Sequence, residues 1–144
     1  MTSEALDARV RALAAAGALF ALTAVAAGAF GAHALRAWLP ADRMGAFETA
    51  ARYQGLHALA LFGCAWALQT WPGRLALAAG ACFAAGIVLF CGSLYVLALS
   101  GEARFGVVTP LGGMSLLAGW ALLTAAIARS GRGRSGNSAP NSAG

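Results

Sequence analysis

Charged side chains are scarce in this chain of 144 residues. They make up 10% of the sequence, while hydrophobic residues make up 60%. Ordinary soluble domains carry about 25% charged residues, which they need to complete a surface that faces water. The scarcity therefore excludes an ordinary soluble domain and predicts an integral membrane protein, with much of its surface against lipid.

Lysine is absent, so all ten basic residues are arginine, against five acidic residues. The resulting formal charge of +5 could suggest a nucleic-acid partner. However, the arginines stand at the borders of apolar stretches, where membrane topology places positive charge. We therefore expect the lipid bilayer as the partner of the chain, and no nucleic acid.

Catalytic motifs are also missing. The sequence has no Gly-x-Ser-x-Gly elbow, no His-Glu-x-x-His and no phosphate-binding glycine loop followed by lysine. Its three cysteines, Cys64, Cys82 and Cys91, lie in apolar stretches without a Cys-x-x-Cys spacing, which favours packing over disulfides or reactive thiols. We predict a protein that is not an enzyme and holds no cofactor.

Four stretches without charge are each long enough to cross a bilayer as a helix, which takes about 20 apolar residues. They cover residues 12–35, 53–73, 75–100 and 105–128. The first is longer than the apolar part of a signal peptide, so we expect it to be retained. The pattern predicts an all-α fold, a membrane bundle of four helices that forms one domain over residues 1–128.

The segment between the first two stretches predicts an amphipathic extension of the second helix. Pro40 suits the start of a helix, and good helix formers follow it, so this helix should begin near Ala41. Glu48 and Arg52 stand four residues apart, in the favourable order for a helical ion pair. Residues 129–144, rich in serine, glycine, asparagine and arginine, are predicted to be a disordered polar tail.

Four spans would place both termini on one side of the membrane. The termini and the second loop carry six arginines, and the other two loops carry four, a bias that favours cytoplasmic termini. The nineteen glycines are expected to let helices approach closely. They recur at Gly17, Gly28 and Gly31, at Gly80, Gly86 and Gly92, and at Gly112, Gly113 and Gly119.

A few polar side chains interrupt the apolar stretches. His33 ends the first stretch, and Tyr53, Gln54 and His57 begin the second, so antiparallel helices would gather them as a cluster near one interface. Secondary candidates for a site are Glu48, Arg52, Ser93, Tyr95 and Thr109. Thr109 is expected to cap the last helix, with Pro110 in its first turn.

Several roles suit this cluster. Hydrogen bonding between helices is the leading interpretation. Haem ligation by His33 and His57 is an alternative, as is a zinc site completed by Glu48 or a cysteine. A solute pathway is another alternative, although no acidic residue lies within a span. The triplets Ala26–Gly28 and Ala84–Gly86 match, as do Trp66–Leu68 and Trp120–Leu122, which would suit the duplicated helix pairs of some transporters.

Four ordered segments resemble the YgdD/YwdK family of small bacterial membrane proteins. They read GAFGAHAL from residue 28, YQGLHALA from residue 53, GSLYVLALS from residue 92 and VTPLGGMSLLAGWAL from residue 108. The resemblance covers roughly residues 12–128, and it implies a four-helix protein of the inner membrane. It implies no reaction, cofactor or catalytic residue.

Together these observations predict a multi-pass protein of the bacterial cytoplasmic membrane. The leading hypothesis is a structural or accessory component that acts through helix packing, as a homo-oligomer or with another membrane protein. A small transporter or channel-like module is the alternative, and a haem-binding protein is a third hypothesis.

Overall fold

The structure is a computed structural model in which residues 2–130 are described. This part of the chain is helical and contains no strand, as the sequence predicts. Its elements are α1 (Ser3–His33), η1 (Leu35–Ala37), α2 (Ala41–Thr70), α3 (Arg74–Gly86), η2 (Ile87–Cys91), α4 (Gly92–Ser100), η3 (Ala103–Val107) and α5 (Thr109–Ser130). Most of the predicted polar tail, residues 131–144, lies outside the described residues.

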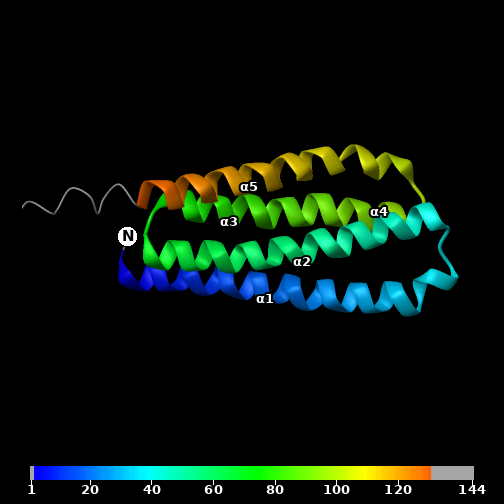
Figure 1. The fold of residues 1–144 in the computed structure, drawn as a ribbon, viewed down its shortest axis with the longest axis horizontal. Helices are drawn as coiled ribbons and strands as arrows, with labels where there is room; N and C mark the ends of the chain where they lie inside the picture. Colours follow the sequence, from blue (N-terminus) through cyan, green and yellow to red (C-terminus); the bar gives the residue numbers. More distant parts are fainter. Residues whose placement is uncertain (1, 131–144) are drawn as a thin grey trace, which may run out of the picture.

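Four long helical segments run side by side and alternate in direction, because α3, η2 and α4 follow one another as a single rod (Figure 1). The order across the molecule is α1, α2, the α3–α4 rod and α5 (Figure 1). Helix α2 contacts every other long segment, whereas α1 packs mainly on α2 and α5 mainly on α3 and η2. Helix α2 is therefore the centre of the bundle.

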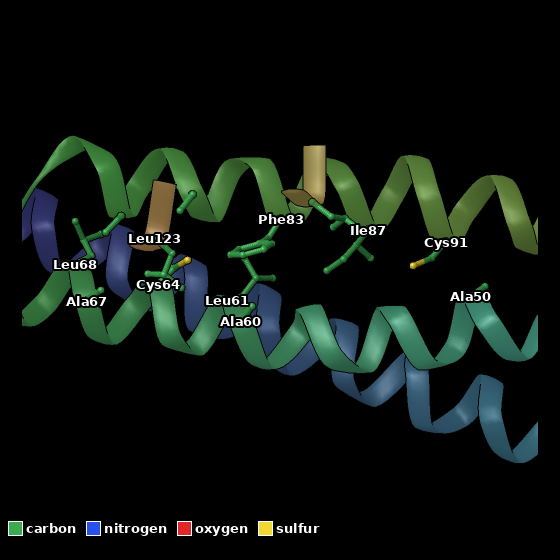
Figure 2. Packing of buried hydrophobic residues seen from close by; sticks show 13 residues of the cluster. Ala50, Ala60, Leu61, Cys64, Ala67, Leu68, Phe83, Ile87, Cys91 and Leu123 are labelled. Atoms are coloured by element: carbon green, nitrogen blue, oxygen red, sulfur yellow. The ribbon is translucent and has the colours of Figure 1, made fainter. Parts of the chain in front are cut away.

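The core lies between α2 and the α3–α4 rod. Leu61, Cys64 and Leu68 of α2 are fully buried, as are Phe83 of α3 and Cys91 of η2 (Figure 2). Apolar contact alone adds little between helices inside a bilayer, so close fit of these side chains is what holds the segments together.

Glycines allow the closest approaches, but fewer of them than the sequence suggested. A Cβ added at Gly112 would collide with the backbone of Phe90, and one at Gly31 would lie 2.9 Å from the ring of Phe47. Gly28 and Gly92, expected to take part in the same packing, have nothing within 4 Å of an added Cβ. These two positions lie on open helix surfaces and take no part in the packing within the bundle.

The ends of the helices follow local signals. Helix α2 begins at Ala41 directly after Pro40, as predicted. Helix α4 ends at Ser100, and Gly101 follows it with a φ of 76°, a left-handed conformation that glycine adopts without strain. The predicted third span is not a uniform α-helix, because residues Ile87–Cys91 form one wide π-helical turn.

Within residues 2–130, three segments are long and apolar enough to cross a membrane: Ser3–Ala37, Arg74–Ser100 and Ala103–Ser130. Helix α2, which contains the predicted span 53–73, is not among them, since its polar residues lower its hydropathy. Yet α2 lies between α1 and the α3–α4 rod along most of their length (Figure 1). A crossing by α2 stays a prediction.

Candidate functional site

Gln54 fixes the alignment of α2 against α1. Its side-chain nitrogen donates to the backbone carbonyl of Phe20, at 3.0 Å, and to the hydroxyl of Thr23, at 2.7 Å. Both partners lie near the middle of the charge-free stretch 12–35 of α1. Gln54 is therefore buried halfway along the apolar length of the bundle.

Tyr53 lies at the same level along the bundle as Gln54, on the other side of α2. Its ring centroid lies 4.9 Å from that of Phe90, which belongs to the middle of the α3–α4 rod. Tyr53 and Gln54 therefore lie level with the middle of the neighbouring apolar segments, whereas the sequence places the cluster near their ends. The reason is that the first turns of α2 pack beside α4, where Arg43 donates to the carbonyl of Ala98 at 2.7 Å, and push Tyr53 towards the centre.

His57 is buried, with 3% of its surface exposed, and both of its ring nitrogens have partners. Nδ1 lies 2.7 Å from the carbonyl oxygen of Tyr53, and Nε2 accepts a hydrogen bond of 3.2 Å from the indole nitrogen of Trp120. A carbonyl can only accept, so these contacts assign the proton of the neutral ring to Nδ1. The imidazole thereby links α2 to α5.

His33 does not join this cluster. It is exposed at the end of α1, two residues beyond Gly31, which packs on Phe47 of α2. His57 follows Phe47 by ten residues, a rise of about 15 Å along a helix. The two imidazoles therefore do not face each other, and the geometry contradicts haem ligation by His33 and His57.

The secondary candidates Ser93, Tyr95 and Thr109 each contact a neighbouring helix. The hydroxyls of Ser93 and Thr109 lie 2.8 Å apart and join α4 to α5. The ring of Tyr95 meets the edge of Phe47 at 4.9 Å, and its buried hydroxyl has no hydrogen-bond partner among residues 2–130. Pro110 lies in the first turn of α5, as predicted, but the predicted cap is wrong: Thr109 is the first residue of the helix, and its hydroxyl contacts Ser93.

Glu48 pairs with Arg36 rather than with Arg52. The distance is 3.1 Å, and both side chains are partly exposed. This pair joins the turn after α1 to α2, so the predicted ion pair within the helix is not formed. Arg52 is exposed one residue before Tyr53, and it makes no ion pair or hydrogen bond within the described part of the chain.

Arg52 lines a shallow groove of about 340 Å³ between α1 and α2. Its other residues are small or aliphatic: Ala21, Ala24, Val25, Ala51, Gly55 and Leu59. Tyr53 and Gln54 are level with the middle of the neighbouring apolar segments. The backbone of Arg52, the residue before Tyr53, therefore lies near that same level. A guanidinium at this depth is costly unless a partner or water reaches it.

Sequence reasoning missed several partners. Thr23 and Trp120 hold Gln54 and His57, and neither stands out, because threonine and tryptophan are common in membrane helices. Arg43 was visible only as one of the border arginines. No group of three or more His, Cys, Asp or Glu side chains that could hold a metal ion occurs among residues 2–130, and the cysteines there are free.

Comparisons with known proteins agree with this membrane architecture. The sequence profile described as "Protein of unknown function (DUF423)" matches residues 27–113. The chain is 48% identical to the inner membrane protein YgdD of Escherichia coli K12 over 99 residues, which are 69% of this chain and 76% of that protein. It is 40% identical to the membrane protein YwdK of Bacillus subtilis over 111 residues, covering 76% and 90% respectively.

A membrane protein of Staphylococcus saprophyticus is similar as well, with 40% identity over 113 residues, 74% of this chain and 88% of the relative. The names of these relatives place them in membranes and state no reaction. No solved structure matches the chain.

Proposed function

Since this chain belongs to the DUF423 family of membrane proteins, we propose that it is a non-enzymatic accessory protein that works by lateral association with a second copy of itself. The observation that carries the proposal is Arg52, an exposed arginine at the depth of the apolar centre of the bundle. A charge there is stabilised when another protein surface covers it and supplies an acceptor.

The surface around Arg52 suits contact with another helix. The groove beside it is lined mostly by alanine and glycine, and small residues let helix backbones approach closely in lipid. Gly45, two turns before Arg52, has nothing within 4 Å of an added Cβ, so a neighbouring helix could also approach there.

The same face also carries the complementary charge. Glu48 lies four residues before Arg52 on α2, and its side chain is 42% exposed although one oxygen binds Arg36. In two copies that insert in the same direction around a two-fold axis, Arg52 of each copy would lie about one helical turn from Glu48 of the other. A carboxylate accepts several hydrogen bonds, so it can bind both arginines.

We further propose that this assembly lies in the bacterial cytoplasmic membrane, as the name of the Escherichia coli relative favours, with both termini in the cytoplasm, as the arginine bias favours. The alternative of a transporter has less support from the geometry. The polar atoms of Gln54 and His57 are used in hydrogen bonds to neighbouring helices.

The test is co-purification of two differently tagged copies expressed in one cell. Arg52→Glu should lower the recovery of the second copy by about tenfold, which corresponds to a loss of roughly 1.4 kcal/mol in the free energy of association. Glu48→Arg should do the same, since each single change brings like charges together. Mixing the two variants should restore recovery, because the carboxylate introduced in one copy then faces the guanidinium introduced in the other.

Arg129→Glu is the matched control, because Arg129 is an exposed arginine in the last turn of α5, away from the Arg52 face. It should leave recovery unchanged. Recovery that persists in both single variants, or fails to return when they are mixed although each is folded by circular dichroism, would contradict the proposal.

A further inference from the structure

A second cavity lies between α2, η2 and α5, beside His57. It has a volume of about 410 Å³, within the usual range for small-molecule sites. Its lining residues are Tyr53, Leu56, His57, Phe90, Gly113, Leu116, Leu117 and Trp120. Four of these carry aromatic or imidazole rings, so the cavity is an aromatic groove and not merely a gap between aliphatic side chains.

The rings form one connected cluster. The centroid of Tyr53 lies 4.9 Å from Phe90 and 5.8 Å from His57, with the His57 ring stacked on it. His57 lies 6.1 Å from Trp120, which closes the far side of the groove. Aromatic neighbours at such spacings attract another flat ring placed among them.

The π-helical turn η2 helps to form the cavity. Gly112 packs directly on the backbone of Phe90, so α5 approaches η2 closely, while a Cβ at Gly113 would lie 3.7 Å from the Phe90 ring. The Phe90 ring therefore lies between α5 and Tyr53. Single π turns within helices are frequently found at functional sites.

One polar group of the groove is available. The hydrogen-bonding capacity of the His57 ring nitrogens is used by Tyr53 and Trp120, as described above. The hydroxyl of Tyr53 makes no hydrogen bond among residues 2–130, and this residue is 41% exposed. In a lipid environment a phenol without a partner is costly, so its hydroxyl favours a molecule that brings an acceptor oxygen.

From this arrangement we propose that the groove binds a lipid-soluble molecule with a flat ring and a carbonyl oxygen, the chemistry of an isoprenoid quinone. The ring lies among Tyr53, Phe90 and Trp120, and the carbonyl accepts a hydrogen bond from the Tyr53 hydroxyl. The groove lies at the depth of the apolar centre, so its occupant enters from the lipid. This site is independent of the Arg52 face.

The test uses the full chain in detergent with decylubiquinone as the probe. Trp38, Trp66 and Trp71 are replaced by phenylalanine, so that Trp120 alone reports binding by fluorescence quenching. Quenching should saturate. Tyr53→Phe should raise the dissociation constant about three- to tenfold, the range for one hydrogen bond. Tyr95→Phe, the matched loss of a hydroxyl outside the groove, should leave it unchanged.

A second pair of variants tests the cavity itself. Gly113→Leu should fill the groove and abolish saturable quenching, whereas Gly92→Leu adds the same side chain at an open position and should not. Three results would overturn the proposal. They are quenching that never saturates, equal effects of Tyr53→Phe and Tyr95→Phe, and displacement of the probe by phosphatidylcholine at equal concentration, which would indicate a site for acyl chains.

Discussion

Hydrogen bonds of single side chains align neighbouring helices in this bundle. Gln54 binds α1, His57 binds α5, and Ser93 binds Thr109 at the start of α5. Each such bond contributes little, about 0.6 kcal/mol on average in membrane helices. These hydrogen bonds mainly align the helices, because a shift of one helix along its neighbour by one turn would leave both partners unpaired in an apolar environment.

Removal of Arg43 should cost more stability than removal of an exposed arginine such as Arg104. The guanidinium of Arg43 donates to the carbonyls of Ala98 and Leu99, at 2.7 and 2.8 Å, at the end of α4. These carbonyls have no partner within the helix, and a cation there also complements the helix dipole. Arg43→Met should lower the free energy of unfolding by about 1–3 kcal/mol, measured by thermal or denaturant unfolding in detergent.

Arg104→Met provides the control for Arg43. Arg104 pairs with Glu102 at 3.3 Å, and its side chain is 74% exposed, so its loss should change stability by less than about 1 kcal/mol. Equal effects of the two substitutions would show that the contacts of Arg43 with α4 do not stabilise the fold.

The candidate residues could be found from the sequence, but their partners could not. Tyr53, Gln54 and His57 stand out because polar side chains are rare in apolar stretches. Which residue each of them meets depends on how far one helix is shifted along another. That shift is set by side-chain fit over the whole interface, which no single residue type reveals. The sequence therefore places His33 in a cluster that it does not reach in the structure.

At the scale of the helices, two adjacent glycines of α5 should respond oppositely to the same change. A Cβ at Gly112 collides with the backbone of Phe90, whereas one at Gly113 lies 3.7 Å from the Phe90 ring, an ordinary contact. Gly112→Ala should destabilise the protein by about 1–3 kcal/mol, the cost of forcing extra volume into a packed interface. Gly113→Ala should be neutral or stabilising by up to about 1 kcal/mol, because alanine favours helix.

Unfolding of the two alanine variants in the same detergent gives the comparison. Since the two changes share one helix and one residue type, helix propensity cancels between them. A loss of stability at Gly113 as large as that at Gly112 would mean that α5 does not pack on the η2 backbone as described.

Element boundaries were predictable where the signal is local. Pro40 before Ala41 indicates the start of α2, and Gly101 ends α4. The π turn of η2 could not be predicted in this way, because Ile87–Cys91 reads as ordinary apolar helix. The π turn lies where Gly112 of α5 packs on the backbone of Phe90. The sequence pattern of residues 87–91 alone does not show which residue of another helix packs there.

At the scale of the whole molecule, α2 is both the most central helix and the least apolar one. It contacts all the other long segments and carries more buried residues than any other helix, including Gln54 and His57. A helix surrounded by other helices needs less hydropathy than one surrounded by lipid, because its neighbours cover its polar groups. The polar residues that lower the hydropathy of α2 are thus compatible with a helix that crosses the membrane at the centre of the bundle.

If α2 crosses the membrane, the protein has four crossings rather than three. We expect four, and reporter fusions at the loops distinguish the two topologies. A crossing by α2 places the loop near Trp38 and the loop near Pro72 on opposite sides of the membrane. Alkaline phosphatase, which is active only outside the cytoplasm, should be active when fused after residue 38 or 102. Green fluorescent protein, which folds in the cytoplasm, should fluoresce when fused after residue 72 or after residue 130.

The decisive comparison is between the fusions after residues 38 and 72. If both report the same side, α2 does not cross, and Arg52 lies in an aqueous or interfacial environment where an exposed arginine is ordinary. If they report opposite sides, α2 carries Arg52, Tyr53, Gln54 and His57 through the membrane within one and a half turns of helix. The cost of placing an arginine at that depth then has to be offset by a partner, and the association tested above becomes a requirement of the topology.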